Sequence, residues 1–225
     1  MEISQKEMGK PVEIEFAVDF HRPKGSPKIF NVLQIRPIVD NKETITENIE
    51  QLDESKTIIY SRSALGNGII EDIFDIVYVD PKSFNPAKTL EIANSIGLLN
   101  DYFLKEKKNY ILIGPGRWGS SDPFLGVPVK WPQISAARVI IESGLDNFRI
   151  DPSQGTHFFQ NLTSFKVGYF TINPFIKDGY YDIDFLSSQK PVFQDDIIRH
   201  LAFEKPLVVK IDGKKSIGVV LKPLE

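Results

Sequence analysis

The sequence of 225 residues contains no cysteine, so disulfides, thiolate metal sites and cysteine nucleophiles are excluded. Histidine is scarce as well: His21, His157 and His200 are scattered along the chain and do not suggest a histidine-rich metal site. The sequence also lacks any apolar run of the roughly 18 residues that a transmembrane helix needs. The start of the chain has no apolar region typical of a signal peptide. These absences predict a cytoplasmic protein without a membrane partner.

The charge balance excludes a further class of partner. The chain has 27 basic and 30 acidic residues, a formal net charge of −3. Dedicated nucleic-acid binders usually carry a basic excess, so no nucleic-acid partner is expected. With 41% hydrophobic and 25% charged residues, the composition is that of a folded globular protein.

Hydrophobic periodicity predicts a mixed α/β (α+β) fold with two parts. A short helix and two strands come first, a charged linker covers residues 41–56, and a compact mixed-sheet domain covers residues 57–225. The first part, residues 1–40, alternates apolar and polar residues over its two predicted strands, 12–20 and 29–39. In the second part the predicted strands are 58–60, 73–80, 109–113, 139–141 and 167–172, the predicted helices are 86–107, 156–165 and 195–203, and a hairpin is predicted over 206–221.

The first two strands present a possible site. Alternation places Glu13 and Glu15 on one face of the first strand, and it places Gln34 and Arg36 on one face of the second. The loop length permits an antiparallel register that sets Glu15 opposite Gln34 and Glu13 opposite Arg36. This cluster can be an exposed ion pair of small energetic effect. It can also be a patch in which carboxylate oxygens hold Mg²⁺ and the guanidinium holds phosphate.

The same residues carry a resemblance. Residues 8–17, followed by Leu-Gln-Ile-Arg-Pro at 33–37, resemble the last hairpin of the ATP-grasp nucleotide-binding domain of the phosphoenolpyruvate synthase and pyruvate phosphate dikinase family. The resemblance implies that Glu15 binds the metal ion held by the ATP phosphates. It implies that Gln34 and Arg36 line the nucleotide site and that Glu13 has a lesser role there. ATP and Mg²⁺ are the cofactors that it implies.

The rest of the chain also resembles this family. Residues 110–120 and 155–160 are similar to the C-terminal region of long bacterial PEP/pyruvate-binding proteins, in which an ATP-grasp domain precedes a region without an assigned role. The resemblance implies a C-terminal fragment of an ATP-dependent phosphotransferase that acts on a small-molecule substrate, pyruvate or a similar acceptor. Its partner would be the upstream ATP-grasp half of the same polypeptide. The fragment lacks half of the nucleotide site, so it is expected to be inactive alone.

A glycine-rich stretch at residues 114–119 matches the G-x-G-x-x-G pattern of dinucleotide-binding loops. That pattern must open a helix, but Ser-Ser-Asp-Pro follows here, which disfavours a dinucleotide site. Two interpretations remain. The glycines can simply form a tight turn. Alternatively, their backbone N–H groups, including that of Gly116, can bind an anion together with Arg117 and Ser120.

His157 follows Thr156 at the predicted start of a helix. A phosphohistidine is disfavoured because two bulky residues, Phe158 and Phe159, follow it. A structural histidine and a ligand-binding histidine both stay open. In the second case we expect Arg117 and His157 to reach the same anion at one concave site.

Two other functions stay open at this stage. Residues 57–225 can be a non-catalytic ligand-binding or regulatory interaction module attached to a kinase. Alternatively, the chain can be a self-contained protein whose first hairpin only mimics the family.

Overall fold

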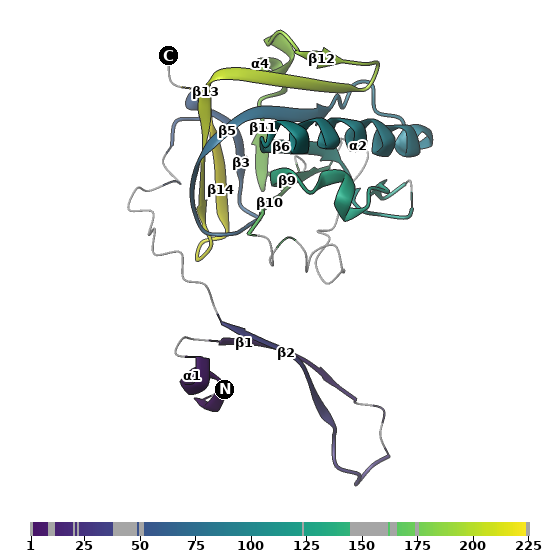
Figure 1. The fold of residues 1–225 in the computed structure, drawn as a ribbon, viewed down its shortest axis with the longest axis vertical. Coiled ribbons are helices and arrows are strands. Elements are labelled where there is room, and N and C mark those ends of the chain that lie inside the picture. The colour runs from purple at the N-terminus through teal and green to yellow at the C-terminus, as the bar shows by residue number, and fades with distance from the viewer. Residues whose placement is uncertain are drawn as a thin grey trace. The chain divides into compact units, whose positions relative to one another are not determined.

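The computed structural model shows two compact units, Met1–Lys42 and Glu43–Glu225 (Figure 1). The boundary at Lys42 falls within the charged stretch at residues 41–56. No helix in the described part of the chain is long and apolar enough to span a membrane. The structure describes residues 2–8, 12–19, 21, 23–37, 49, 52–122, 124–144, 162, 166–173 and 176–223.

The first unit is a helix followed by a β-hairpin. Helix α1 (Glu2–Met8) contacts both β1 (Val12–Val18) and β2 (Phe30–Pro37), which pair antiparallel. The predicted helix and both predicted strands are thereby confirmed. Only Val12 is buried among the described side chains of the two strands, so the hairpin has little core of its own.

The second unit is built on one large mixed sheet, which confirms the predicted α+β class. The strand order is β11-β3-β14-β13-β5-β6-β9-β10-β4, with β12 on β13. Neighbours among β5, β6, β9 and β10 are parallel, and the remaining neighbours are antiparallel. The strands are β3 (Thr57–Ser61), β4 (Ala64–Leu65), β5 (Gly68–Val79), β6 (Tyr110–Pro115), β9 (Ala137–Ser143), β10 (Gly168–Ile172), β11 (Gly179–Tyr181), β12 (Phe193–Gln194), β13 (Ile198–Asp212) and β14 (Ile217–Leu221).

The sheet curls back on itself. Strands β3 and β4 belong to one short segment, yet β3 pairs with β14 while β4 pairs with β10 from the far end of the sheet. Alternate residues then face two separate cores. In β6, Ile111 and Ile113 join a cluster with residues from strands all across the sheet, whereas Tyr110 and Leu112 pack in a cluster that includes α2. Burial on both faces explains why these strands are continuous apolar runs.

Helix α2 (Thr89–Glu106) covers one face of the sheet after a single 3₁₀ turn, η3 (Pro86–Lys88), which confirms the helix predicted over 86–107. Its buried Asn100 anchors the following loop. The Asn100 amide donates to the Pro132 carbonyl at 2.9 Å, and its oxygen accepts from the Ala136 N–H at 2.9 Å and the Tyr110 hydroxyl at 3.2 Å. Burial raises the pKa of the Tyr110 phenol.

The helix predicted over residues 195–203 is wrong, because these residues lead into and begin the long strand β13. The Asp195 carboxylate accepts from the N–H groups of Ile197 and Ile198, at 2.8 and 2.6 Å, and forms a tight turn instead of a helix cap. Pro206, which cannot donate to a ladder, falls where the pairing of β13 with β5 shifts register. The hairpin predicted over 206–221 is confirmed: β13 and β14 pair antiparallel around a turn at residues 213–216.

Within the described residues, the second unit also contains shorter helices and a two-strand sheet. The smaller helices are η2 (Glu54–Lys56), η4 (Trp131–Ile134) and α4 (Ile183–Ser188), and the small sheet pairs β7 (Arg117–Trp118) with β8 (Gly126–Val127) in parallel. The helix predicted over 156–165 lies outside the described residues, apart from Leu162.

Candidate functional site

The hairpin has the register that the sequence predicts. Glu15 lies opposite Gln34, and Glu13 lies opposite Arg36. Residues directly opposite each other on antiparallel strands share a face, so the Glu15 carboxylate and the Gln34 amide lie on one side of the sheet, and both are exposed. The structure describes the backbone positions of Glu13 and Arg36 but not their side chains. The predicted strand pairing is therefore confirmed, and the nucleotide site itself stays a prediction.

A β-bulge in β2 determines which side chains lie on the polar face of this hairpin and which lie on its apolar face. After the Glu15–Gln34 pair, the next pair is Phe16 with Val32, so β2 carries one extra residue, Leu33. The extra residue moves Phe30 and Val32 to the face opposite Gln34. There the rings of Phe16 and Phe30 stack with their centroids 4.5 Å apart. One face of the hairpin thus carries Glu15 and Gln34, and the other face is apolar.

The glycine-rich stretch forms a closed turn after β6. Four successive backbone N–H groups bond to the chain itself: Gly116 to Ser143 O, Arg117 to Leu125 O, Trp118 to the Glu142 carboxylate and Gly119 to Val127 O, at 2.8–3.0 Å. The Ser120 hydroxyl donates to the Asp122 carbonyl at 3.0 Å. The hypothesis that these N–H groups are available to bind an anion is wrong, and a structural turn accounts for the glycines.

Close packing explains why glycine occupies two positions, Gly114 in β6 and Gly126 in β8. A Cβ atom on Gly114 would lie 2.2 Å from the Trp118 ring, and one on Gly126 would lie 1.9 Å from the Arg117 carbonyl oxygen. The Trp118 side chain is 1% exposed, and its indole N–H donates to the Ile141 carbonyl at 3.1 Å. Trp118 is therefore a core residue held by the turn and does not stack on a ligand.

His157 lies outside the described residues, as does the whole segment 155–157. The expected meeting of Arg117 and His157 at one anion site stays a prediction. The Arg117 side chain is partly buried, and Gly116, next to it, is buried.

Glu142 is a buried carboxylate that the sequence reasoning missed. It is 0% exposed, and it accepts from the Trp118 N–H at 2.9 Å and from the Tyr169 hydroxyl at 2.5 Å. Through these bonds it joins β9, β10 and the glycine turn. The available signal was an acidic residue directly after the apolar run Val-Ile-Ile, where the predicted strand was ended too early.

A second buried polar pair joins β5 to β13. Asp75 and His200 are 4% and 3% exposed, and the Asp75 Oδ1 and His200 Nε2 atoms lie 2.7 Å apart. The His200 ring packs against Phe103 of α2 in a T-shaped arrangement, with 5.1 Å between ring centroids. The two residues are far apart in the sequence, so nothing in the local pattern predicts the pair. Its enclosure under α2 indicates a structural role.

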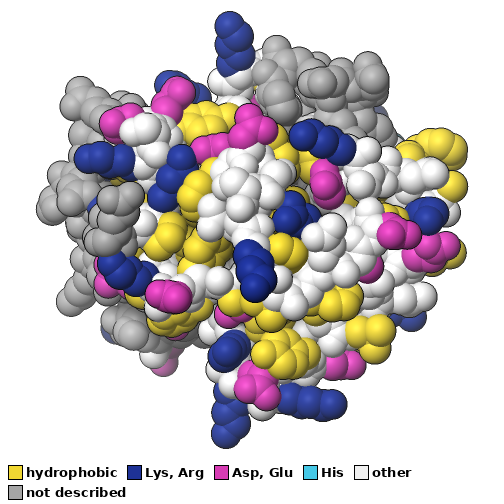
Figure 2. Space-filling view, turned by 90° about the horizontal axis from the view of Figure 1, so that it is seen from above, with side chains coloured by type: hydrophobic (Ala, Val, Ile, Leu, Met, Phe, Trp, Pro, Cys, Tyr) yellow, Lys and Arg dark blue, Asp and Glu magenta, His cyan; other side chains and the backbone are white. Residues whose placement is uncertain are grey.

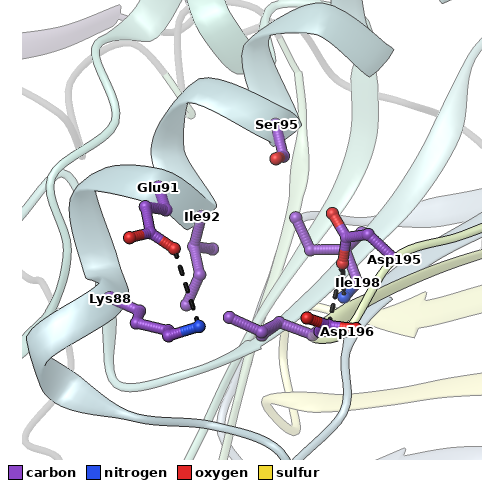
Figure 3. Close-up of a pocket in the computed structure, with 8 residues that line it drawn as sticks. Lys88, Glu91, Ile92, Ser95, Asp195, Asp196 and Ile198 are labelled. Atoms are coloured by element: carbon purple, nitrogen blue, oxygen red, sulfur yellow. Dashed lines mark hydrogen bonds and ion pairs between the residues drawn. The ribbon is translucent and has the colours of Figure 1, made fainter.

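A hollow of about 300 Å³ lies between the start of α2 and the turn before β13 (Figure 3). Lys88, Glu91 and Ser95 come from the helix side, and Asp195 and Asp196 face them from the turn. The Lys88 ammonium lies 3.8 Å from a Glu91 oxygen in an exposed pair. The sequence reasoning missed this hollow, because it assigned Asp195 to a helix.

Two further kinds of site were sought, a metal cluster among the described residues and a basic surface on the face seen in Figure 2. In the described parts of both units, no group of three histidine or acidic side chains is placed to hold a metal ion. On the face seen in Figure 2, lysine and arginine side chains are interspersed with aspartate and glutamate over short distances. That pattern differs from the continuous basic surfaces that bind nucleic-acid backbones.

Comparisons of this chain with protein-family models, with curated proteins and with solved structures found no match.

Proposed function

We propose that the β1–β2 hairpin forms one wall of an ATP- and Mg²⁺-binding site in a phosphotransferase similar to phosphoenolpyruvate synthase and pyruvate phosphate dikinase. The observation that supports this most directly is the cross-strand register, with Glu15 opposite Gln34 and Glu13 opposite Arg36. The phosphoryl acceptor is pyruvate or a similar small molecule.

The residue types suit this role. The Glu15 carboxylate is exposed and offers hard oxygen ligands of the kind that Mg²⁺ prefers. Gln34, on the same face, offers an amide donor and acceptor to the nucleotide. Arg36 is the residue type that matches phosphate in bidentate geometry. Bound Mg²⁺ supplies charge neutralisation at the phosphates, and its other ligands would come from the nucleotide and water.

The exposed apolar face of the hairpin supports the proposal that another part of the polypeptide packs against it. Phe16, Phe30 and Val32 are each at least 50% exposed. A two-stranded hairpin is marginally stable by itself and needs an apolar face covered by other structure. In this proposal the upstream ATP-grasp half of the same polypeptide covers the apolar face and completes the nucleotide site. The chain alone therefore binds nucleotide weakly and transfers no phosphate.

A second candidate function is a non-catalytic ligand-binding module in residues 57–225. The observation that favours it is the hollow beside α2, which is lined by charged side chains from two elements. This function is compatible with the first, because the two sites lie in different units.

Titration calorimetry with Mg²⁺·ATP tests the nucleotide site. We expect weak binding to the 225-residue chain, with affinity reduced about tenfold in Glu15→Gln, the effect of losing one charge-assisted contact. Glu7→Gln is the matched control, because it removes an exposed carboxylate from α1 of the same unit. Pyruvate-dependent formation of AMP or ADP should stay at the level of a blank without protein.

Two results would contradict the proposal. One is equal affinity in wild type and Glu15→Gln. The other is ATP turnover by the chain alone, since a half-site without its upstream partner cannot position both substrates.

A further inference from the structure

We propose that Asn31 is a further nucleotide-binding residue, which contacts the ribose hydroxyls of an ATP molecule held at Glu15 and Gln34. The inference rests on the proposed function of the hairpin and adds to it a residue that determines nucleotide specificity. The observation that carries it is the effect of the β-bulge in β2 on the face to which Asn31 belongs.

The bulge brings Asn31 to the polar face of the hairpin. Asn31 and Gln34 are three residues apart, so strict alternation would place their side chains on opposite faces. The extra residue, Leu33, changes this phase, and Asn31 pairs with Ala17, which lies on the same face of β1 as Glu15. Bulges are frequent next to active sites, where they re-aim a side chain. Here the bulge gives the polar face a further amide.

Asn31 is the polar residue of an otherwise apolar segment. Its neighbours Phe30, Val32 and Leu33 are hydrophobic, and Asn31 itself is exposed. Asparagine is depleted in β-strands, so strand formation by itself does not favour this residue. Ala17, directly opposite, is small and also exposed, which keeps this part of the polar face accessible to a ligand.

The residue types along the polar face give the nucleotide a direction. Asn31 lies on one side of the pair formed by Glu15 and Gln34, and the backbone positions of Arg36 and Glu13 lie on the other side. The metal ion and the phosphates belong at the charged end, since carboxylates bind Mg²⁺ and guanidinium groups bind phosphate.

The uncharged nucleoside then extends toward Asn31. The pair of Asn31 with Ala17 is two residues beyond Glu15 along β1, a distance of about 7 Å. This is comparable with the separation between the β-phosphate and the ribose in an extended nucleotide. A neutral amide can donate to and accept from hydroxyl groups, so Asn31 matches the ribose chemically.

A comparison of two nucleotides tests the contact. ATP and 2′,3′-dideoxy-ATP, each with Mg²⁺, are titrated into the 225-residue chain while the amide NMR signals of β1 and β2 are followed. We expect wild type to bind the dideoxy nucleotide about fivefold more weakly, the effect of one lost hydrogen bond. Asn31→Ala should bind both nucleotides equally and as weakly as wild type binds the dideoxy form, because either change removes the same contact.

Two further variants separate this contact from the nucleotide site as a whole. Ser26→Ala removes another neutral polar side chain from the loop of the same hairpin, and it should keep the fivefold preference for ATP. Glu15→Gln should weaken both nucleotides about tenfold and keep the ratio between them.

The outcomes distinguish this inference from the proposed function. A preference for ATP that persists in Asn31→Ala, or that is absent from wild type, would overturn the role of Asn31, even where Glu15-dependent binding of ATP upholds the nucleotide site. Absence of any ATP binding to wild type would overturn both.

Discussion

Replacing Glu142 with leucine is expected to lower the free energy of unfolding of the second unit by about 2–6 kcal/mol. Leucine has a similar size but cannot accept hydrogen bonds, so it removes the carboxylate acceptor of the buried Trp118 N–H and Tyr169 O–H groups, at about 1–3 kcal/mol for each lost bond. Urea unfolding followed by tryptophan fluorescence measures the change. Both tryptophans, Trp118 and Trp131, belong to the second unit, so the signal reports on that unit alone.

Glu142→Gln is the matched control for this experiment. Glutamine keeps an oxygen for the Trp118 N–H, and the Tyr169 hydroxyl can turn to accept from the new amide group. A loss of only about 1 kcal/mol is therefore expected. If the leucine variant were as stable as wild type, or if both variants lost the same amount, Glu142 would not hold the glycine turn in the way described.

Replacing Gly126 with alanine is expected to destabilise the second unit by about 3 kcal/mol or more, because the new methyl group has no room. It would lie 1.9 Å from the Arg117 carbonyl oxygen and 2.4 Å from the Arg117 nitrogen. These are backbone atoms, so no side-chain rotation relieves the contact and β7 must separate from β8. Urea unfolding measures the loss, and faster hydrogen exchange at Arg117 and Gly119 would locate it in the turn.

Gly97→Ala provides the comparison. Gly97 lies inside α2, and an added methyl group would meet side-chain atoms of Gln133, the nearest being Nε2 at 3.2 Å and Cγ at 3.4 Å, and no backbone atom at such distances. Alanine favours a helix over glycine by about 1 kcal/mol, so stability should stay within about 1 kcal/mol of wild type. Equal losses at Gly97 and Gly126 would mean that the close backbone approach in the turn is not what requires glycine.

The features that sequence alone predicted are those that depend on neighbouring residues. Alternation in β1 and β2, together with a short loop, was sufficient to predict the pairing of Glu15 with Gln34. Helix α2 followed from the regular return of Ile92, Ile96 and Phe103. The bulge at Leu33 was not predicted, because the sequence analysis used one continuous register for the two strands.

The features that were missed depend on distant residues. The segment at 195–203 has helix-like spacing, yet ladder pairing with β5 makes it a strand. The glycine turn fitted an anion-binding pattern because sequence does not reveal which acceptors its N–H groups meet. Those acceptors come from Ser143, Leu125, Val127 and Glu142. The hollow likewise combines α2 with residues about a hundred positions later, so no local motif marks it.

The position of Mn²⁺, added with ATP in place of Mg²⁺, tests most directly whether the hairpin is a metal and nucleotide site. Paramagnetic Mn²⁺ broadens the NMR signals of nearby amides. We predict selective broadening along the Glu15 and Gln34 positions of β1 and β2, with the broadening lost in Glu15→Gln and kept in Glu7→Gln. Broadening that is absent from the hairpin, or that persists unchanged in Glu15→Gln, would contradict the assignment.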